Sequence, residues 1–304
     1  MPRLRPVGRG PQVAVVTDST ASLPSGVAER WGIEIVPLEV VIDGARRHEG
    51  VDLKPGELLA ALTAGRRVTT SQPAPAAFAR AYARAAERGA REIVSVHLSS
   101  ELSGTVRAAE LAALAAPVPV HVVDSRTVAM GLGLAAVAAA ELAAKPRPGR
   151  RWLITRAGWP DGVAVADRAR QIAASASTVF LMDSVEHLRR GGRLGAGAAA
   201  MGTLLGLRPL LAVRSGRIEV IEKVRTRGAA RERLESLTIK EVARRGAAQV
   251  AVHHLGQPDA AASLAGRLEE WLGDCGGEVA VSEGSAVVAA HAGPGVLAVV
   301  VADR

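Results

Sequence analysis

The sequence predicts an α/β protein of two domains, and three observations support this fold class. The chain has 304 residues, 48% of them hydrophobic, which is enough for a buried core in more than one domain. In the first half, short runs of branched apolar residues alternate with alanine-rich amphipathic segments, as in a parallel sheet covered by helices. From about Thr178 this rhythm changes, and two predicted strands flank a short polar loop that contains glycine.

The first half is predicted to form a parallel sheet flanked by helices, in a domain that spans residues 12–176. Its strands are expected at Val13–Thr17, Ile33–Ile42, Ile93–His97 and Val120–Asp124. Its helices are expected at Pro24–Trp31, Pro55–Ala64, Pro75–Arg88, Gly104–Ala115 and Met130–Ala144. Several of these helices begin with proline, whose missing N–H costs nothing in the first turn.

The second half is predicted to form an α+β domain with a partly antiparallel sheet, over residues 177–304. Its strands are expected at Val179–Met182, Pro209–Val213, Ile218–Lys223, Val250–His253, Val279–Ser282 and Val296–Val301. The loop Arg214–Arg217 between the second and third of these predicts a β-hairpin. Because a hairpin joins antiparallel strands, this sheet cannot be purely parallel.

The net charge of +8 raises the question of nucleic-acid binding, and the distribution of the charge argues against it. All but four of the 38 cationic residues are arginines, and they are scattered along the chain in pairs such as Arg46 and Arg47. Aromatic residues that could stack on bases make up only 2% of the chain. We therefore expect no nucleic-acid partner.

The sequence also predicts a cytoplasmic protein without stable membrane insertion. The first ten residues contain no apolar run typical of a signal peptide, and the single cysteine, Cys275, cannot form an intrachain disulfide. The apolar stretch Val128–Ala140 is shorter than the roughly 20 residues needed to cross a bilayer core.

The usual catalytic motifs are absent from the sequence. The seven histidines form no HExxH pair, and there is no GxSxG elbow, no GxxxxGK[ST] loop and no GxGxxG after the first strand. A single cysteine cannot build a zinc knuckle. We expect no metal and no cofactor.

Three segments are rich in hydroxyl groups. Two of them follow predicted strands, where an open α/β sheet receives ligands, and the third, Thr69–Pro73, follows a basic turn. Thr17–Thr20 is interpreted as a helix cap. Thr69–Pro73 precedes a helix predicted to start near Pro75, so its hydroxyls and the free N–H groups there could hold a carboxylate or phosphate oxygen. His97–Thr105 carries several more hydroxyls. The last two segments either converge on one anion or act as separate caps.

Two further residues have both a structural and a functional interpretation. His291, before a glycine-proline turn, is either a structural histidine or, if the fold brings it to the hydroxyl loops, a donor to an oxyanion. Arg225 lies in an alternating charged stretch after a strand, and it is either part of a solvated edge or a phosphate-facing arginine.

At these same positions the chain resembles the DegV family, from about Val13 to Val301. The matching motifs are TDST (17–20), PLEVVIDG (37–44), EGVD (49–52), TTSQP (69–73), HLSSELSGT (97–105), VDSRTVAMGLG (123–133), LRRGGRL (188–194), LGLRPLL (205–211), EKVRTRG (222–228) and HAGPG (291–295). The resemblance implies the two-domain EDD fold. It also implies a protein that binds one long-chain fatty acid and, in many members, presents it to a separate ATP-dependent fatty-acid kinase for phospholipid synthesis.

The resemblance further implies roles for particular residues. The carboxylate of the fatty acid would be held by Thr70, Ser71, Ser100, Ser103 and His291, with Ser99 as an alternative contact in the second loop. Arg225 would serve phosphoryl transfer or kinase docking. The acyl chain would run between the domains, near Met130–Gly133 and Met201–Leu205.

These observations lead to one principal hypothesis and an alternative. The principal hypothesis is a lipid-binding protein, not an enzyme on its own, in which burial of each CH₂ group contributes about 0.8 kcal/mol and a few polar groups orient the acid. The alternative is a stand-alone enzyme that acts on a small anionic substrate, with Asp18, Ser100 and His291 as acid-base candidates.

Overall fold

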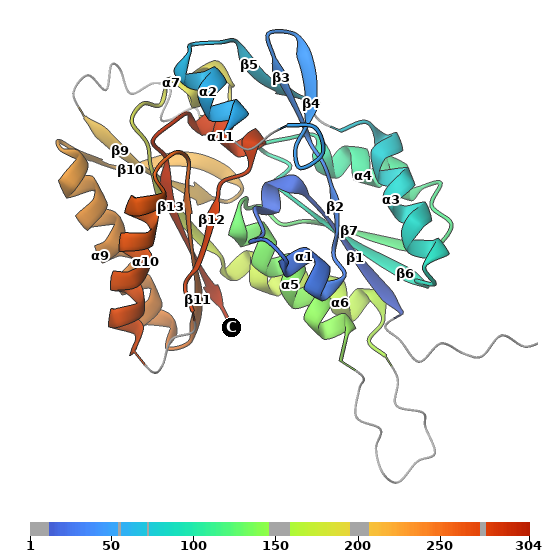
Figure 1. Cartoon of the computed structure of the whole chain (residues 1–304). Coiled ribbons are helices and arrows are strands. Elements are labelled where there is room, and N and C mark those ends of the chain that lie inside the picture. The colour runs from blue at the N-terminus through green and yellow to red at the C-terminus, as the bar shows by residue number, and fades with distance from the viewer. Residues whose placement is uncertain (1–11, 54–55, 72, 146–158, 195–206, 274–277) are drawn as a thin grey trace, which may run out of the picture.

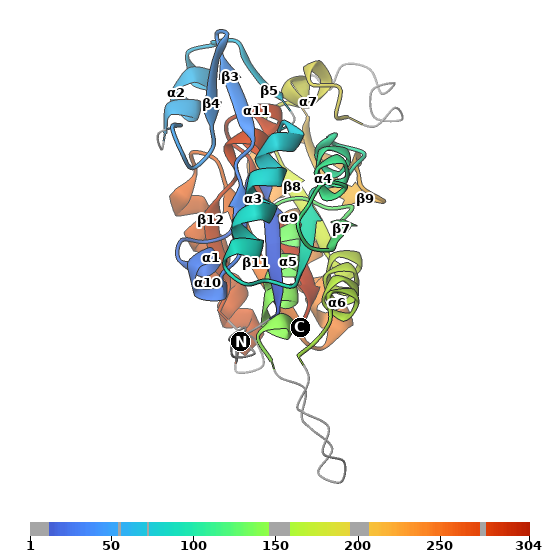
Figure 2. The same ribbon diagram turned by 90° about the vertical axis from the view of Figure 1, so that its right-hand side faces the viewer.

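The computed structural model describes residues 12–53, 56–71, 73–145, 159–194, 207–273 and 278–304. Within these ranges the strands form two large sheets and one small sheet (Figure 1). The large sheets lie side by side, and the small sheet lies at one end of the molecule together with α2 (Glu57–Thr63) (Figure 2).

The first large sheet is parallel and has the order β2-β1-β6-β7. Its strands are β1 (Val13–Asp18), β2 (Glu34–Val36), β6 (Glu92–His97) and β7 (Val120–Asp124). Successive side chains of a strand point to opposite faces, so Val94 and Val96 join one apolar cluster while Ile93 joins another. Both faces of this sheet are therefore buried.

Helices cover the two faces of the parallel sheet. On one face lie α3 (Pro75–Glu87) and α4 (Thr105–Ala113), and on the other lie α5 (Met130–Ala143) and α6 (Gly162–Ser175). Helix α5 packs against strands of both large sheets, and nearly all of its residues are buried. This position explains why its sequence is apolar on nearly every face, with Glu141 as its one charged residue.

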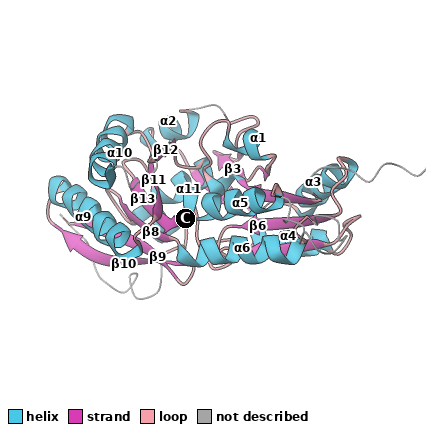
Figure 3. Cartoon of the chain, turned by 90° about the horizontal axis from the view of Figure 1, so that it is seen from below, coloured by secondary structure: helices cyan, strands magenta, loops and turns pink. Residues whose placement is uncertain are grey.

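The second large sheet has the order β10-β9-β8-β13-β11-β12, and only its β11–β12 pair is parallel. Helices α9 (Arg227–Arg245) and α10 (Pro258–Leu272) cover its outer face (Figure 3). The predicted hairpin is confirmed, because β9 and β10 pair antiparallel around Ser215 and Gly216. The strands of this sheet are β8 (Ser177–Leu181), β9 (Arg208–Arg214), β10 (Arg217–Val224), β11 (Ala248–His254), β12 (Ala280–Glu283) and β13 (Leu297–Asp303).

The small sheet consists of β3 (Glu39–Ile42), β4 (Ala45–His48) and β5 (Val68–Ser71), all antiparallel. The prediction of one strand over Ile33–Ile42 was wrong, since β2 ends at Val36 and β3 begins at Glu39 in a different sheet. Pro37 lies between them, and proline has no N–H to donate to a strand ladder.

The helix predicted to start near Pro75 is confirmed, but Thr69–Ser71 do not form a loop before it. These residues lie in strand β5, where Thr70 pairs with Val40 of β3. Helix α3 begins only at Pro75. The hydroxyls are therefore presented from an edge strand of the small sheet.

The remaining short helices connect the sheets: η1 (Ser19–Ala21), α1 (Val27–Trp31), α7 (Glu186–Arg190) and α11 (Ala286–Ala292). The predicted fold class is confirmed, because a parallel sheet flanked by helices stands beside a mostly antiparallel one. In the part of the chain described here, no helix is both long and apolar enough to span a membrane.

Candidate functional site

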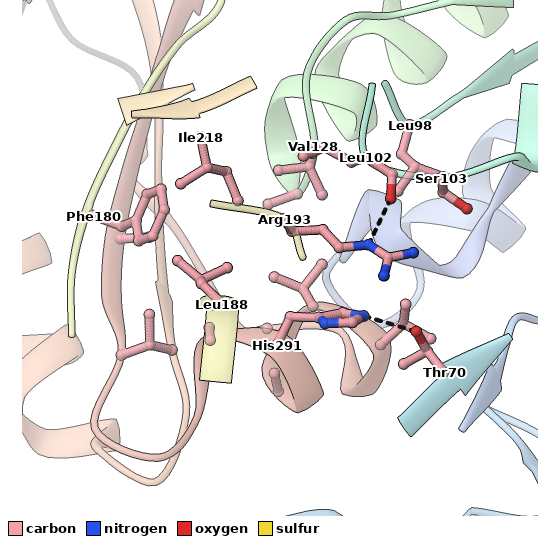
Figure 4. Close-up of a pocket in the computed structure, with 18 of the residues that line it drawn as sticks. Thr70, Leu98, Leu102, Ser103, Val128, Phe180, Leu188, Arg193, Ile218 and His291 are labelled. Atoms are coloured by element: carbon pink, nitrogen blue, oxygen red, sulfur yellow. Dashed lines mark hydrogen bonds between the residues drawn. The ribbon is translucent and has the colours of Figure 1, made fainter. Parts of the chain in front are cut away.

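A cavity of about 420 Å³ lies where the small sheet and the two large sheets meet. Its wall is mainly aliphatic, with Leu98 and Leu102 from the loop after β6 and Ile218 from β10 (Figure 4). Phe180 of β8 lies on the side of the cavity opposite Thr70. Helix α11 contributes five residues to the wall: Val287, Val288, Ala289, His291 and Ala292.

A group of polar side chains gathers on one side of the cavity. The Oγ1 of Thr70, from β5, lies 2.7 Å from the Nε2 of His291, from α11. Beside them, Arg193 follows α7 and donates from Nε to the carbonyl oxygen of Leu102 at 3.1 Å. Figure 4 shows the guanidinium group between the loop after β6 and the imidazole. Three elements that are distant in sequence thus meet at one polar end.

His291 is held in its neutral form. Burial lowers the pKa of His291 to about 4, and the neighbouring Arg193 and His187 add to the lowering. A neutral imidazole has one N–H donor and one acceptor nitrogen. At neutral pH, His291 can therefore offer a single hydrogen bond to an anion, and the positive charge at this end comes from Arg193.

Arg193 was not identified from the sequence as a cavity residue. The segment Glu186–Arg193 was interpreted as a helix C-terminus with basic residues that complement the dipole. Arg189 and Arg190 fit that interpretation, because both pair with Glu186. Arg193 differs, since among the described residues its guanidinium group bonds only to the carbonyl oxygens of Leu102 and Gly191.

Of the four serines named from the sequence, two line the cavity and two do not. Ser71 and Ser103 line the cavity, but the Ser71 hydroxyl donates to Oε2 of Glu39, which does not line it, at 2.6 Å. Ser100 is exposed and donates to Oδ2 of Asp124 at 2.5 Å, outside the cavity wall. Ser99 is buried and donates to the carbonyl oxygen of Gly216 at 2.8 Å.

Two other candidates lie away from the cavity wall. Arg225 is exposed in the turn between β10 and α9. Asp18 is completely buried at the end of β1, where its carboxylate contacts His97. Of the three acid-base candidates of the enzymatic alternative, His291 is the one that lines the cavity.

His253 is a second cavity residue that the sequence did not identify. Its Nε2 accepts the N–H of Met130 at 3.1 Å, so its Nδ1–H donates to the Ser282 hydroxyl at 3.0 Å. Burial lowers the pKa of His253 to about 4. The imidazole thus caps the N-terminus of α5 from the neighbouring sheet.

Two glycines allow the chain to pack closely around His291 at the polar end of the cavity. Gly191 lies so near His291 that a Cβ there would overlap the ring nitrogen Nδ1. Gly293 follows α11 with φ +78°, a conformation that L side chains rarely adopt. These positions give a physical reason for glycine in the RRGGR and HAGPG motifs.

Two further expectations from the sequence concern a metal ion and the lining of the cavity. Within the described ranges, no group of three or more His, Cys, Asp or Glu side chains could hold a metal ion. The expected lining at Met201–Leu205 lies outside the described residues.

Fold and site together define an α/β protein in which two large sheets and a small sheet enclose an apolar cavity with one polar end. The family model described as "Uncharacterised protein, DegV family" matches residues 12–148 and 160–304. The chain belongs to the DegV family.

Relatives and solved structures agree with this assignment. The chain is 47% identical to the DegV domain-containing protein SCO2569 of Streptomyces coelicolor, over 96% of this chain and 99% of that protein. It is similar in structure to a DegV family protein from Thermus thermophilus described by its fatty acid binding, with a TM-score of 0.81 and 34% identity over 96% and 100% of the chains. It is also similar to DegV of Bacillus subtilis, described as a fatty acid binding protein, with a TM-score of 0.82 and 27% identity over 96% and 99%.

Proposed function

We propose that this chain binds one long-chain fatty acid, with the acyl chain in the apolar cavity and the carboxylate at its polar end. The single observation that carries the proposal is the cavity itself, in which an aliphatic wall ends at Thr70, His291 and Arg193. The similarity to fatty acid binding proteins of Thermus thermophilus and Bacillus subtilis supports it.

The chemistry of the two ends fits such a ligand. Each CH₂ group removed from water contributes about 0.8 kcal/mol, so the aliphatic wall supplies affinity. A carboxylate taken out of water requires hydrogen bonds and a partner charge, or it takes up a proton instead. Arg193 supplies the charge, while the hydroxyls of Thr70 and Ser103 and one N–H of His291 supply donors.

We further propose that the chain presents the bound acid to a separate ATP-dependent fatty-acid kinase, so that the chain itself performs no catalysis. In this role the chain orients the carboxylate and the kinase supplies the phosphoryl group. Arg225 is proposed to face the kinase or the transferred phosphoryl group. Its exposure beside the turn into α9 leaves it accessible to a partner.

The first test is denaturing extraction of freshly purified protein, followed by mass spectrometry of the released small molecules. We expect one long-chain fatty acid per chain, and delipidated protein should take up palmitate again. The double variant Thr70→Ala and His291→Ala should bind palmitate on the order of a hundredfold more weakly, because two hydrogen bonds to a charged group are lost. A folded, delipidated protein that takes up no fatty acid would refute the proposal.

A further inference from the structure

Glu49 occupies an unusual position for a carboxylate, because it joins the small sheet to the helix that carries His291. It follows strand β4, and its backbone N–H donates to the carbonyl oxygen of Leu38 at 3.0 Å. Its side chain points away from β4 and reaches Ser285, the residue before α11. This contact spans 236 positions of sequence.

The Glu49 carboxylate receives donors from the start of α11 and from η1. The Ser285 hydroxyl donates to Oε2 at 2.8 Å, and the backbone N–H groups of Ala286 and Val287 donate as well. The Ser19 hydroxyl adds a fourth hydrogen bond. Burial raises the pKa of Glu49, and these hydrogen bonds oppose that effect by favouring the charged form.

Helix α11 is therefore fixed to the small sheet at both of its ends. At its first turn the fixing group is Glu49, beside β4, and at its last turn it is the bond from His291 to Thr70 of β5. The helix also packs against β3, β5 and α2, and Figure 1 shows it directly beneath that sheet. A seven-residue helix has little stability of its own, so its caps matter more than in a longer helix.

We propose that Glu49 is a positioning residue for the headgroup site: it sets the orientation of α11 and so holds His291 where it meets Thr70 and the ligand. This inference rests on the proposed fatty-acid function. It gives the EGVD motif a role at the site although Glu49 does not line the cavity.

The test is a double-mutant cycle between Glu49→Gln and His291→Ala, with palmitate and hexadecanol as probes. Glu49→Gln should weaken palmitate binding roughly tenfold in the wild-type background and less than about twofold in the His291→Ala background. Hexadecanol has no carboxylate, so its affinity should stay within about twofold in all variants. Equal losses in both backgrounds, or for both probes, would overturn the proposal.

A matched control distinguishes the positioning of His291 from the general effect of removing a charged helix cap. Asp161 caps α6 by accepting the N–H of Ala164 at 2.8 Å, away from the cavity wall. Asp161→Asn makes the same change from acid to amide and should leave palmitate affinity unchanged. If Glu49→Gln does not fold, Ser285→Ala removes one of the donors and should produce the same pattern with a smaller loss.

A second readout needs no ligand and so distinguishes failure of this inference from failure of the proposed function. The imidazole of His291 can be titrated by NMR in ligand-free protein. Removal of the negative charge at position 49 would by itself lower the pKa of His291 further. If α11 instead reorients, the His291 ring becomes more exposed to water, and its pKa rises from about 4 towards 6.5. A rise supports positioning, and an unchanged or lower value contradicts it.

Discussion

Two histidines in this structure, His97 and His291, show how a buried imidazole can be structural in one place and available to a ligand in another. His97 ends strand β6 on the face covered by α3, and His291 lies in the last turn of α11 at the cavity. Both follow apolar sequence and stand near hydroxyl groups. His291 was named as a candidate from the sequence and His97 was not, although no local feature of the sequence separates the two.

His97 belongs to a chain of hydrogen bonds in which both of its ring nitrogens have partners. Its Nδ1–H donates to Asp18 Oδ2 at 3.0 Å, and its Nε2 accepts the hydroxyl of Ser95 at 2.7 Å. The Tyr82 hydroxyl then donates to Ser95 at 2.9 Å, and burial raises the pKa of Tyr82 to about 12. The hydrogen-bonded order Asp18, His97, Ser95 is that of a catalytic triad. These three side chains and Tyr82 are all buried, so no substrate can reach the serine.

His291 has a different set of neighbours. Its one hydrogen bond among the described residues is to the Thr70 hydroxyl, and its neighbour Arg193 is cationic. It also borders a cavity, whereas His97 does not. The comparison teaches that unused hydrogen-bonding capacity beside a cavity, and not the type of residue, separates the proposed binding site from the core.

The largest effect that would test this comparison is expected for Asp18→Ala. Asp18 also accepts the N–H groups of Thr20 and Leu98 at 3.0 and 3.1 Å, so its loss leaves His97 and two backbone donors without partners. We expect the free energy of unfolding, measured with urea, to fall by about 3–5 kcal/mol. Asp161→Ala, at an exposed helix cap, should cost about 1 kcal/mol. Equal losses would show that the Asp18 network is no more than an ordinary cap.

A second test uses pH, since His253 shares with His97 the property that both ring nitrogens are bonded. The pKa of His253 is about 4 in the folded protein against 6.5 for the free side chain. The unfolded chain therefore binds protons first as pH falls, so this stability is complete above pH 6.5 and is lost between 6.5 and 4.

The loss due to His253 should be on the order of 3 kcal/mol, and His291 should add to it with the same sign. Glu49, whose pKa is raised, opposes the loss at the acid end. Urea unfolding from pH 7.5 to pH 4 measures the curve, and in His253→Gln its slope should be smaller. Wild-type stability that does not change over this interval would contradict the prediction.

The third test removes the cation at the polar end. Arg193→Gln should weaken palmitate binding roughly thirtyfold, because the carboxylate loses a charge-assisted hydrogen bond. Hexadecanol binding should stay nearly constant, and the pKa of His291 should rise because a neighbouring positive charge is gone. If both probes weaken equally, Arg193 supports the cavity wall and not the headgroup.

The smallest effect is expected at Arg225, which lies outside the cavity wall. Arg225→Ala should leave palmitate affinity unchanged and slow acyl-phosphate formation by an added fatty-acid kinase about tenfold, if one charge-assisted contact is lost. Arg214→Ala, at an exposed position in the neighbouring hairpin, serves as the control. A change in palmitate affinity without a change in transfer would contradict the proposed role.

Much of the fold could be predicted because buried strands and amphipathic helices leave a local period in the sequence. The run Ile93–His97 and the hairpin around Gly216 were located correctly for this reason. The small sheet was missed where the apolar period fails, since β4 is largely exposed and contains two arginines.

The site was harder to predict, because long-range packing creates it. Thr70 and His291 are 221 positions apart, and their meeting depends on how the small sheet lies over α11. Arg193 follows two arginines that remain at the helix end, and no local feature distinguishes it from them. The family resemblance supplied Thr70 and His291 as candidates, whereas the structure was needed to find Arg193 and His253.

The packing of helix α5 between the two large sheets determines whether the two halves of the chain can fold separately. Its sides contact β1 and β6 of one large sheet and β13 of the other, and apart from Glu141 its residues are apolar. A fragment that ends before β8 would expose the face of α5 that β13 covers, and such a surface favours aggregation. The two halves should therefore unfold in one cooperative transition, and neither half should be a modular unit that can be transplanted without the other.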